Sequence, residues 1–137
     1  MFTTLGEYRQ QPCDMDKYET FLTALIERYD GDGNDDMEGL LFPIHAWEVA
    51  NEPAIAEVGE DAGVVFYEGT REEYYDLLVS SYETIKAADE DASVLHAGMF
   101  AINETATDFW DEVFGLGATD YFDIANYHSI SSNSEDL

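Results

Sequence analysis

The fold of this chain is decided by residues 44–53, which read Ile44-His45-Ala46-Trp47-Glu48-Val49-Ala50-Asn51-Glu52-Pro53. The stretch begins as an apolar run of strand type. It stops at Pro53, because proline has no N–H to donate and a fixed φ, so a strand ladder ends there. Asn51 and Glu52 are therefore predicted to stand at the carboxyl end of a buried strand. In α/β folds that end of a strand is where binding and catalytic groups gather.

Two amphipathic helices are predicted on either side of this strand. In each, apolar residues recur at i, i+3, i+4, i+7, i+8 and i+11, which is one stripe of a helix packed on one side. The first helix is predicted to start at an Asp-led capping box, Asp16 with Glu19, and the second at Thr70 with Glu73. The stripes are Tyr18, Phe21, Leu22, Leu25, Ile26 and Tyr29, and then Tyr74, Leu77, Leu78, Ser81, Tyr82 and Ile85.

The remaining elements complete an alternating order of helix, strand, helix, strand, helix and strand. Strands are predicted at 40–50, 93–100 and 121–128, an irregular loop at 53–69, and a third helix around 109–114. Near-continuous apolar strands that alternate with amphipathic helices indicate parallel βαβ units, so the predicted fold class is α/β. No glycine fingerprint links a strand to a helix, which argues against a dinucleotide-binding fold. The pattern alone does not choose a closed barrel over an open sheet.

The charge is extreme, with 31 acidic residues against 5 basic ones and a formal net charge of −26. A nucleic-acid partner is not expected, because phosphate binding needs a basic surface. An anionic membrane would repel the chain as well, and no apolar run approaches the roughly 20 residues of a membrane span. Self-repulsion at low salt and its screening at molar salt predict a protein adapted to high salt. Cys13 is the only cysteine, so the cellular compartment, including secretion of a longer parent, stays open.

An acidic loop after the first helix suggests calcium at first sight. Asp30, Asp32 and Asn34 alternate as in an EF-hand loop. However, Asp35 stands at the sixth position, where glycine is required, and Leu41 at the twelfth, where a bidentate Glu belongs. A solvated acidic turn is therefore preferred to a calcium site. The three histidines lie on three predicted strands without HExxH spacing, so no metal site is predicted.

The order Trp47-x-x-x-Asn51-Glu52-Pro53 resembles the fourth strand of the clan of retaining glycoside hydrolases built on TIM barrels. Further stretches at 29–33, 82–89 and 121–128 resemble its family-39-like, or cellulase-like, branch. The resemblance implies that residues 1–137 form part of a catalytic (β/α)8 barrel, from about helix three to strand six. Strands one, two, seven and eight would be missing. A whole barrel needs about 250 residues, so 137 are too few.

The resemblance also implies a function: hydrolysis of O-glycosidic bonds in carbohydrates by double displacement. Glu52 would be the general acid/base, and Asn51 and His128 would contact the sugar. The nucleophile would lie on strand seven, outside this chain, so the fragment alone is predicted to be inactive. Neither a metal nor an organic cofactor is implied.

Other interpretations remain open. Glu52 can be an ordinary acid of a very acidic protein, Asn51 a turn residue and His128 a structural histidine at a strand end. Trp47 is interpreted as packing, and His45 and His96 as buried, hydrogen-bonded core histidines. At the level of function, the alternatives are a non-catalytic carbohydrate-binding or scaffold barrel and a calcium-dependent acidic surface protein. A strand ending in Glu about one βα unit after Leu137 would favour the enzyme.

Overall fold

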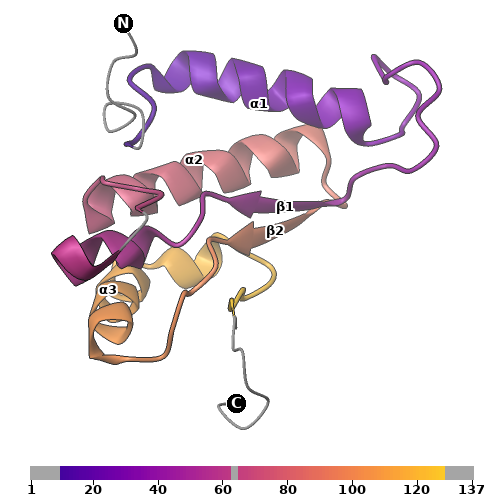
Figure 1. The fold of residues 1–137 in the computed structure, drawn as a ribbon. Helices are drawn as coiled ribbons and strands as arrows, with labels where there is room; N and C mark the ends of the chain where they lie inside the picture. Colours follow the sequence, from indigo (N-terminus) through magenta and orange to yellow (C-terminus); the bar gives the residue numbers. More distant parts are fainter. Residues whose placement is uncertain (1–9, 63–64, 129–137) are drawn as a thin grey trace, which may run out of the picture.

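The computed structural model describes residues 10–62 and 65–128. It is a mixed α/β structure with three α-helices and two parallel strands, in the predicted alternating order (Figure 1). The α-helices are α1 (Met15–Tyr29), α2 (Arg71–Ala88) and α3 (Glu104–Gly115), and the strands are β1 (Ala46–Val49) and β2 (Ser93–His96). Two 3-10 segments, η2 (Pro53–Ala62) and η3 (Ala118–Asp120), complete the elements. The α/β class predicted from the sequence is thus confirmed.

The two strands pair in parallel, with Ala46 opposite Ser93 and Val49 opposite His96. In Figure 1, α1 and α2 run side by side, and α2 lies between α1 and the strands. The carboxyl end of β1 leads into η2, which packs against α3. Because the two strands are parallel, their carboxyl ends lie at the same edge of the sheet.

The α2 helix forms as the sequence predicted. Thr70 accepts the N–H of Glu73, and the Glu73 carboxylate accepts the N–H of Thr70, so both bonds of the capping box are present. The predicted stripe is buried at five of its six positions, and only Tyr82 is half-buried. These contacts hold α2 against the sheet and against α1.

The α1 helix starts one residue after a different cap. Asp14, and not Asp16, is the N-cap, because its carboxylate accepts the N–H of Lys17 at 3.1 Å. Asp16 instead lies in the first turn, where a negative charge favours the helix dipole. Phe21 was predicted within the buried stripe but is 62% exposed, since only the Leu22 and Ile26 side of the helix faces α2.

Both observed strands are shorter than predicted. Residues 40–45 are not paired, and Leu41 and Phe42 are largely exposed. A strand ladder needs a partner, and β2 offers one only from Ser93 onward, where the Ser93 N–H donates to His45 O. Residues 53–69 were predicted to be irregular, whereas the structure forms η2 in the first part of them.

The third predicted strand, 121–128, forms no regular ladder with β2 in the described part of the chain, where the pairing is limited to two isolated parallel bridges, Leu95 with Ile124 and Met99 with Tyr127. The reason is local. The N–H of Val94 donates to the side chain of Asp123 instead of a strand carbonyl, while Val94 O accepts from two successive N–H groups. An aspartate that takes over a ladder hydrogen bond interrupts regular pairing.

One face of the sheet is covered and the other is open within the described residues. Trp47 and Val49 pack toward the helices, whereas Ala46 and Glu48 are exposed. The core centres on α2 and α3, where Tyr74 and Trp110 meet edge to face at 5.5 Å. Among the described helices, none combines the length and apolarity that a membrane crossing requires.

Candidate functional site

Glu52 lies in a turn between β1 and η2 rather than on the strand itself. β1 ends at Val49, and both Ala50 (φ 67°) and Glu52 (φ 42°) adopt the left-handed region. Residues with side chains rarely adopt this conformation, and strained positions of this kind cluster at functional sites. The strand was predicted to run to Ala50 with Asn51 and Glu52 at its carboxyl end, and it ends one residue earlier, at Val49. Glu52 follows in the turn, where its side chain is only 12% exposed.

His128 contacts Glu52 directly. The imidazole Nδ1 lies 2.9 Å from Oε1 of Glu52, although 76 residues separate the two in the sequence. His128 reaches this place because its backbone N–H donates to Met99 O, next to the bridge between Met99 and Tyr127. Two of the three residues predicted for the site thus lie side by side at the carboxyl edge of the sheet.

Glu48 is a site residue that the sequence analysis missed. Its Oε1 accepts the backbone N–H of Gly98 at 3.0 Å and lies 3.6 Å from Nε2 of His128. The imidazole is therefore flanked by two carboxylates, Glu52 at Nδ1 and Glu48 at Nε2. The sequence could have indicated Glu48, because it precedes Glu52 by four residues. In an extended strand, residues 48, 50 and 52 lie on the same face.

The His128 ring fits only because residue 98 is a glycine. A Cβ added at Gly98 would lie 2.2 Å from Nε2 of His128, far inside van der Waals contact. The same backbone supplies the N–H that holds Glu48. Gly98 therefore combines a close approach to the ring with the anchoring of a neighbouring acid.

His96 is a buried neutral histidine next to the carboxyl edge of the sheet. Its Nδ1 donates to Ala97 O at 2.6 Å, and its Nε2 accepts the N–H of Asn126 at 3.2 Å. Burial lowers the pKa of His96, with smaller opposing contributions from Ala97 O and Glu48. The bond from Asn126 also fixes the segment that carries His128.

The other predicted core histidine is not in the core. The His45 side chain is 57% exposed and lies 3.4 Å from Asp89, so that prediction is wrong. β1 pairs only from Ala46, which leaves His45 just before the strand at its open amino end. Trp47 does pack against the core, as interpreted, and its indole Nε1 is buried without a partner among the described residues.

Asn51 is half-buried in the turn before Glu52. Within residues 10–62 and 65–128, its side-chain amide forms no hydrogen bond. Sugar contact by Asn51 and His128 stays a prediction.

An arginine holds the segment that follows Glu52. Arg71 makes two hydrogen bonds to the Glu57 carboxylate of η2, at 2.8 and 2.6 Å, and also pairs with Glu112 of α3. A guanidinium fork on a carboxylate fixes orientation as well as distance. Because η2 begins at Pro53, this clamp restrains the chain directly after Glu52.

The acidic loop after α1 lies at the opposite end of β1. One carboxylate oxygen from each of Asp30, Asp32 and Asp36 lies within 4.8 Å of the others. These carboxylates accept backbone N–H groups of their own loop, for example Gly31 and Gly33 on Asp36 at 2.9 Å. Asp30 is only 5% exposed, whereas residues 31–35 of the loop are exposed, as a solvated turn requires. The absence of a metal site stays a prediction.

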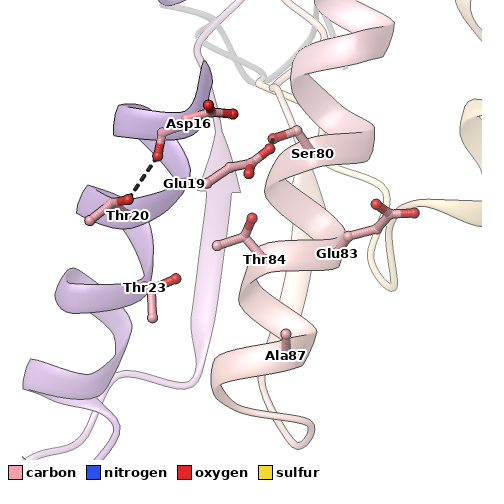
Figure 2. A pocket seen from close by; sticks show the side chains of 8 residues that line it. All are labelled: Asp16, Glu19, Thr20, Thr23, Ser80, Glu83, Thr84 and Ala87. Atoms are coloured by element: carbon pink, nitrogen blue, oxygen red, sulfur yellow. Dashed lines mark hydrogen bonds between the residues drawn. The ribbon is translucent and has the colours of Figure 1, made fainter. Parts of the chain in front are cut away.

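A separate groove of about 520 Å³ lies between α1 and α2 (Figure 2). Its acids and hydroxyls come from these two helices and bond to them: Thr20 donates to Asp16 O, and Ser80 donates to Glu19. Neither Glu52 nor His128 lines it. The groove is therefore distinct from the candidate site.

Replacing Gly98 by alanine should displace His128. The new methyl group would occupy the space of the imidazole, and such overpacking costs about 1–3 kcal/mol. Urea denaturation of the full-length protein measures the loss, and a crystal structure shows the ring position. Gly115→Ala is the matched control, because nothing lies within 4 Å of a Cβ there. Equal stability of both variants with an unmoved ring would contradict the geometry.

His96 should make stability depend on pH. Its pKa is lowered in the folded state, so the unfolded chain binds a proton first as the pH falls. The contribution of His96 is therefore complete above its unfolded pKa of about 6.5 and is lost as the pH falls toward the lower folded pKa. Unfolding free energies measured between pH 8 and 5 should fall less in His96→Gln than in the parent. His45→Gln, which changes an exposed histidine, is the matched variant for comparison.

Comparison with solved structures finds chains of similar fold, and one of them is a glucosidase. A glucosidase from Croceicoccus marinus matches 88% of this chain with a TM-score of 0.61 at 17% sequence identity. This chain spans 24% of the length of that structure. No protein-family model matches the sequence, and no curated protein matches it. At this identity the likeness establishes a shared fold over the matched part, with a glycoside hydrolase as a distant structural neighbour.

Proposed function

We propose that this chain is part of a retaining glycoside hydrolase, with Glu52 as its general acid/base. The observation that carries the proposal is the Glu52–His128 contact of 2.9 Å at the carboxyl edge of a parallel sheet. It places a shielded carboxyl where α/β proteins hold their chemistry. The Trp47 to Pro53 motif and the glucosidase neighbour support the same assignment.

The proposed architecture is a (β/α)8 barrel of which residues 1–137 supply a part. Two features support it: the sheet has an open face among the described residues, and the chain matches 24% of the length of a glucosidase. In a barrel, the open face, with exposed Glu48 and Ile124, would turn toward the remaining strands. The nucleophile would come from residues outside this chain.

The proposed reaction has two steps. In the first, the protonated Glu52 carboxyl gives its proton to the glycosidic oxygen while the nucleophile attacks the sugar carbon. In the second, the ionised Glu52 takes a proton from water, which attacks the glycosyl-enzyme. Limited exposure of Glu52 excludes most bulk water from the proton to be transferred. Asn51 and His128 line the place where the sugar would sit.

Glu52→Gln in the full-length protein should separate two kinds of substrate. Glycosides with poor leaving groups need the proton and should lose about 10²–10⁴-fold in kcat/KM. Dinitrophenyl glycosides need little protonation and should keep their first step. Glucosides are the first probe, since the structural neighbour is a glucosidase. Added azide should restore turnover of the dinitrophenyl substrate, because azide attacks the glycosyl-enzyme without a general base.

Glu104→Gln is the matched control for this experiment, because Glu104 is an exposed acid at the start of α3. It should leave both substrates unaffected. Equal losses on both substrate types in Glu52→Gln would remove Glu52 from the acid/base role. Glycan binding by the parent without any turnover would instead identify a non-catalytic carbohydrate-binding barrel.

We also infer adaptation to high salt from the net charge of −26. The Debye length falls to about 3 Å at 1 M salt, so repulsion among exposed carboxylates is then largely screened. The Tm of the full-length protein should rise steeply between 0.1 and 2 M KCl. A sucrose series at matched osmolality is the control, because sucrose strengthens burial without screening charge. A Tm that does not change with KCl would contradict the inference.

A further inference from the structure

Two carboxylates face the two nitrogens of one imidazole. Nδ1 of His128 lies 2.9 Å from Glu52, and Nε2 lies 3.6 Å from Glu48. The position of the Glu48 oxygen is fixed, because it also accepts the backbone N–H of Gly98 at 3.0 Å. The 3.6 Å separation is slightly longer than a hydrogen bond and is an ion-pair distance only for a protonated ring, and catalytic hydrogen bonds that are long in the free protein often tighten when a ligand binds.

The partner of each nitrogen decides where the ring proton resides. In a neutral imidazole, one nitrogen donates a hydrogen bond and the other accepts one, and the surroundings select the tautomer. An ionised carboxylate can only accept, so Glu48 favours a proton on Nε2. The Asn126 amide lies 3.5 Å from Nε2 and can present its oxygen there, since amide oxygen and nitrogen are interchangeable by a flip.

We propose that Glu48 is a positioning residue that keeps a proton on Nε2 of His128 and so reserves Nδ1 for Glu52. Its effect on catalysis rests on the proposed role of Glu52, whereas its effect on the ring proton does not. With Nε2 protonated, the Nδ1 lone pair accepts the O–H of a protonated Glu52. When Glu52 gives that proton to the leaving-group oxygen, Nδ1 keeps its lone pair, and it accepts the O–H again once Glu52 has taken a proton from the attacking water. The Nε2 proton stays in place throughout.

The protons balance over one reaction cycle. Glu52 gives one proton to the leaving-group oxygen and regains one from the attacking water. His128 ends the cycle in the protonation state in which it began. Glu48 neither gains nor loses a proton, and it acts only through the ring that it orients.

The direct test is nitrogen NMR of the full-length protein with ¹⁵N-labelled histidine. The chemical shifts of the two ring nitrogens report which of them carries a proton, and His128→Gln assigns the signals. Two other histidines are internal references: His96, held with its proton on Nδ1 by Ala97 O, and exposed His45. In the unaltered protein at pH 7, His128 should carry a proton on Nε2.

Glu48→Gln is the decisive variant, because glutamine keeps an oxygen for the Gly98 N–H but loses the charge. Its His128 should lose protonation at Nε2 in favour of Nδ1, while the signals of His96 and His45 remain unchanged. A proton absent from Nε2 in the unaltered protein, or unaffected by Glu48→Gln, would overturn the proposal. The measurement on the unaltered protein decides this even if the variant fails to fold.

Kinetic measurements separate the proposed role of Glu48 from the proposed acid/base role of Glu52. Glu48→Gln should lower kcat about 10–100-fold on substrates with poor leaving groups, the size typical of residues that orient a functional group, and should spare dinitrophenyl substrates. Equal losses on both substrates would reduce Glu48 to a structural role. If Glu52→Gln leaves hydrolysis unchanged, the proposed function fails, while the NMR result on the ring proton still stands.

Discussion

The hydrogen bond between Glu52 and His128 joins the turn after β1 to the last described residue, at one edge of the sheet. It can form only because three separate conditions are met: β1 and β2 run parallel, the chain turns through left-handed residues before Pro53, and Gly98 leaves room for the ring. Together they bring a carboxyl and an imidazole from distant parts of the sequence within 2.9 Å.

The remaining structure serves to hold that edge in place. The capping box sets the start of α2, and Tyr74 of α2 accepts the N–H of Ala97 at the end of β2. Burial raises the pKa of Tyr74, so the hydroxyl stays neutral in this role. Arg71 ties η2 to α2 and α3 and uses one of only five basic residues to do so. In a chain of this charge, a cation at such a junction also reduces local repulsion between acids.

Sequence patterns predicted α2 and the end of β1 close to Pro53 well, because both depend on short-range chemistry. Thr70 and Glu73 exchange hydrogen bonds within one helical turn. Pro53, which follows Asn51 and Glu52, predicts the end of a strand. The sequence patterns gave wrong predictions where two residues could both cap a helix, and where a strand needs a neighbouring strand to pair with. Asp14 and Asp16 are both acids near a helix start, and only one of them is the N-cap. The apolar pattern of residues 121–128 predicts a strand, whereas in the structure the side chain of Asp123 accepts the N–H of Val94 that a strand carbonyl would otherwise accept.

The sequence by itself determined the alternation of helices and strands, the acidic surface and the identity of Glu52 as the residue to examine. These follow from periodicity, charge and a local motif, which need no knowledge of distant contacts. Only the tertiary structure decided that His128 lies on Glu52, that Glu48 flanks the same ring, and that His45 lies outside the core. Such contacts depend on how far β1 and β2 pair and where each segment ends, because pairing sets which residues meet across 50 to 80 positions of chain.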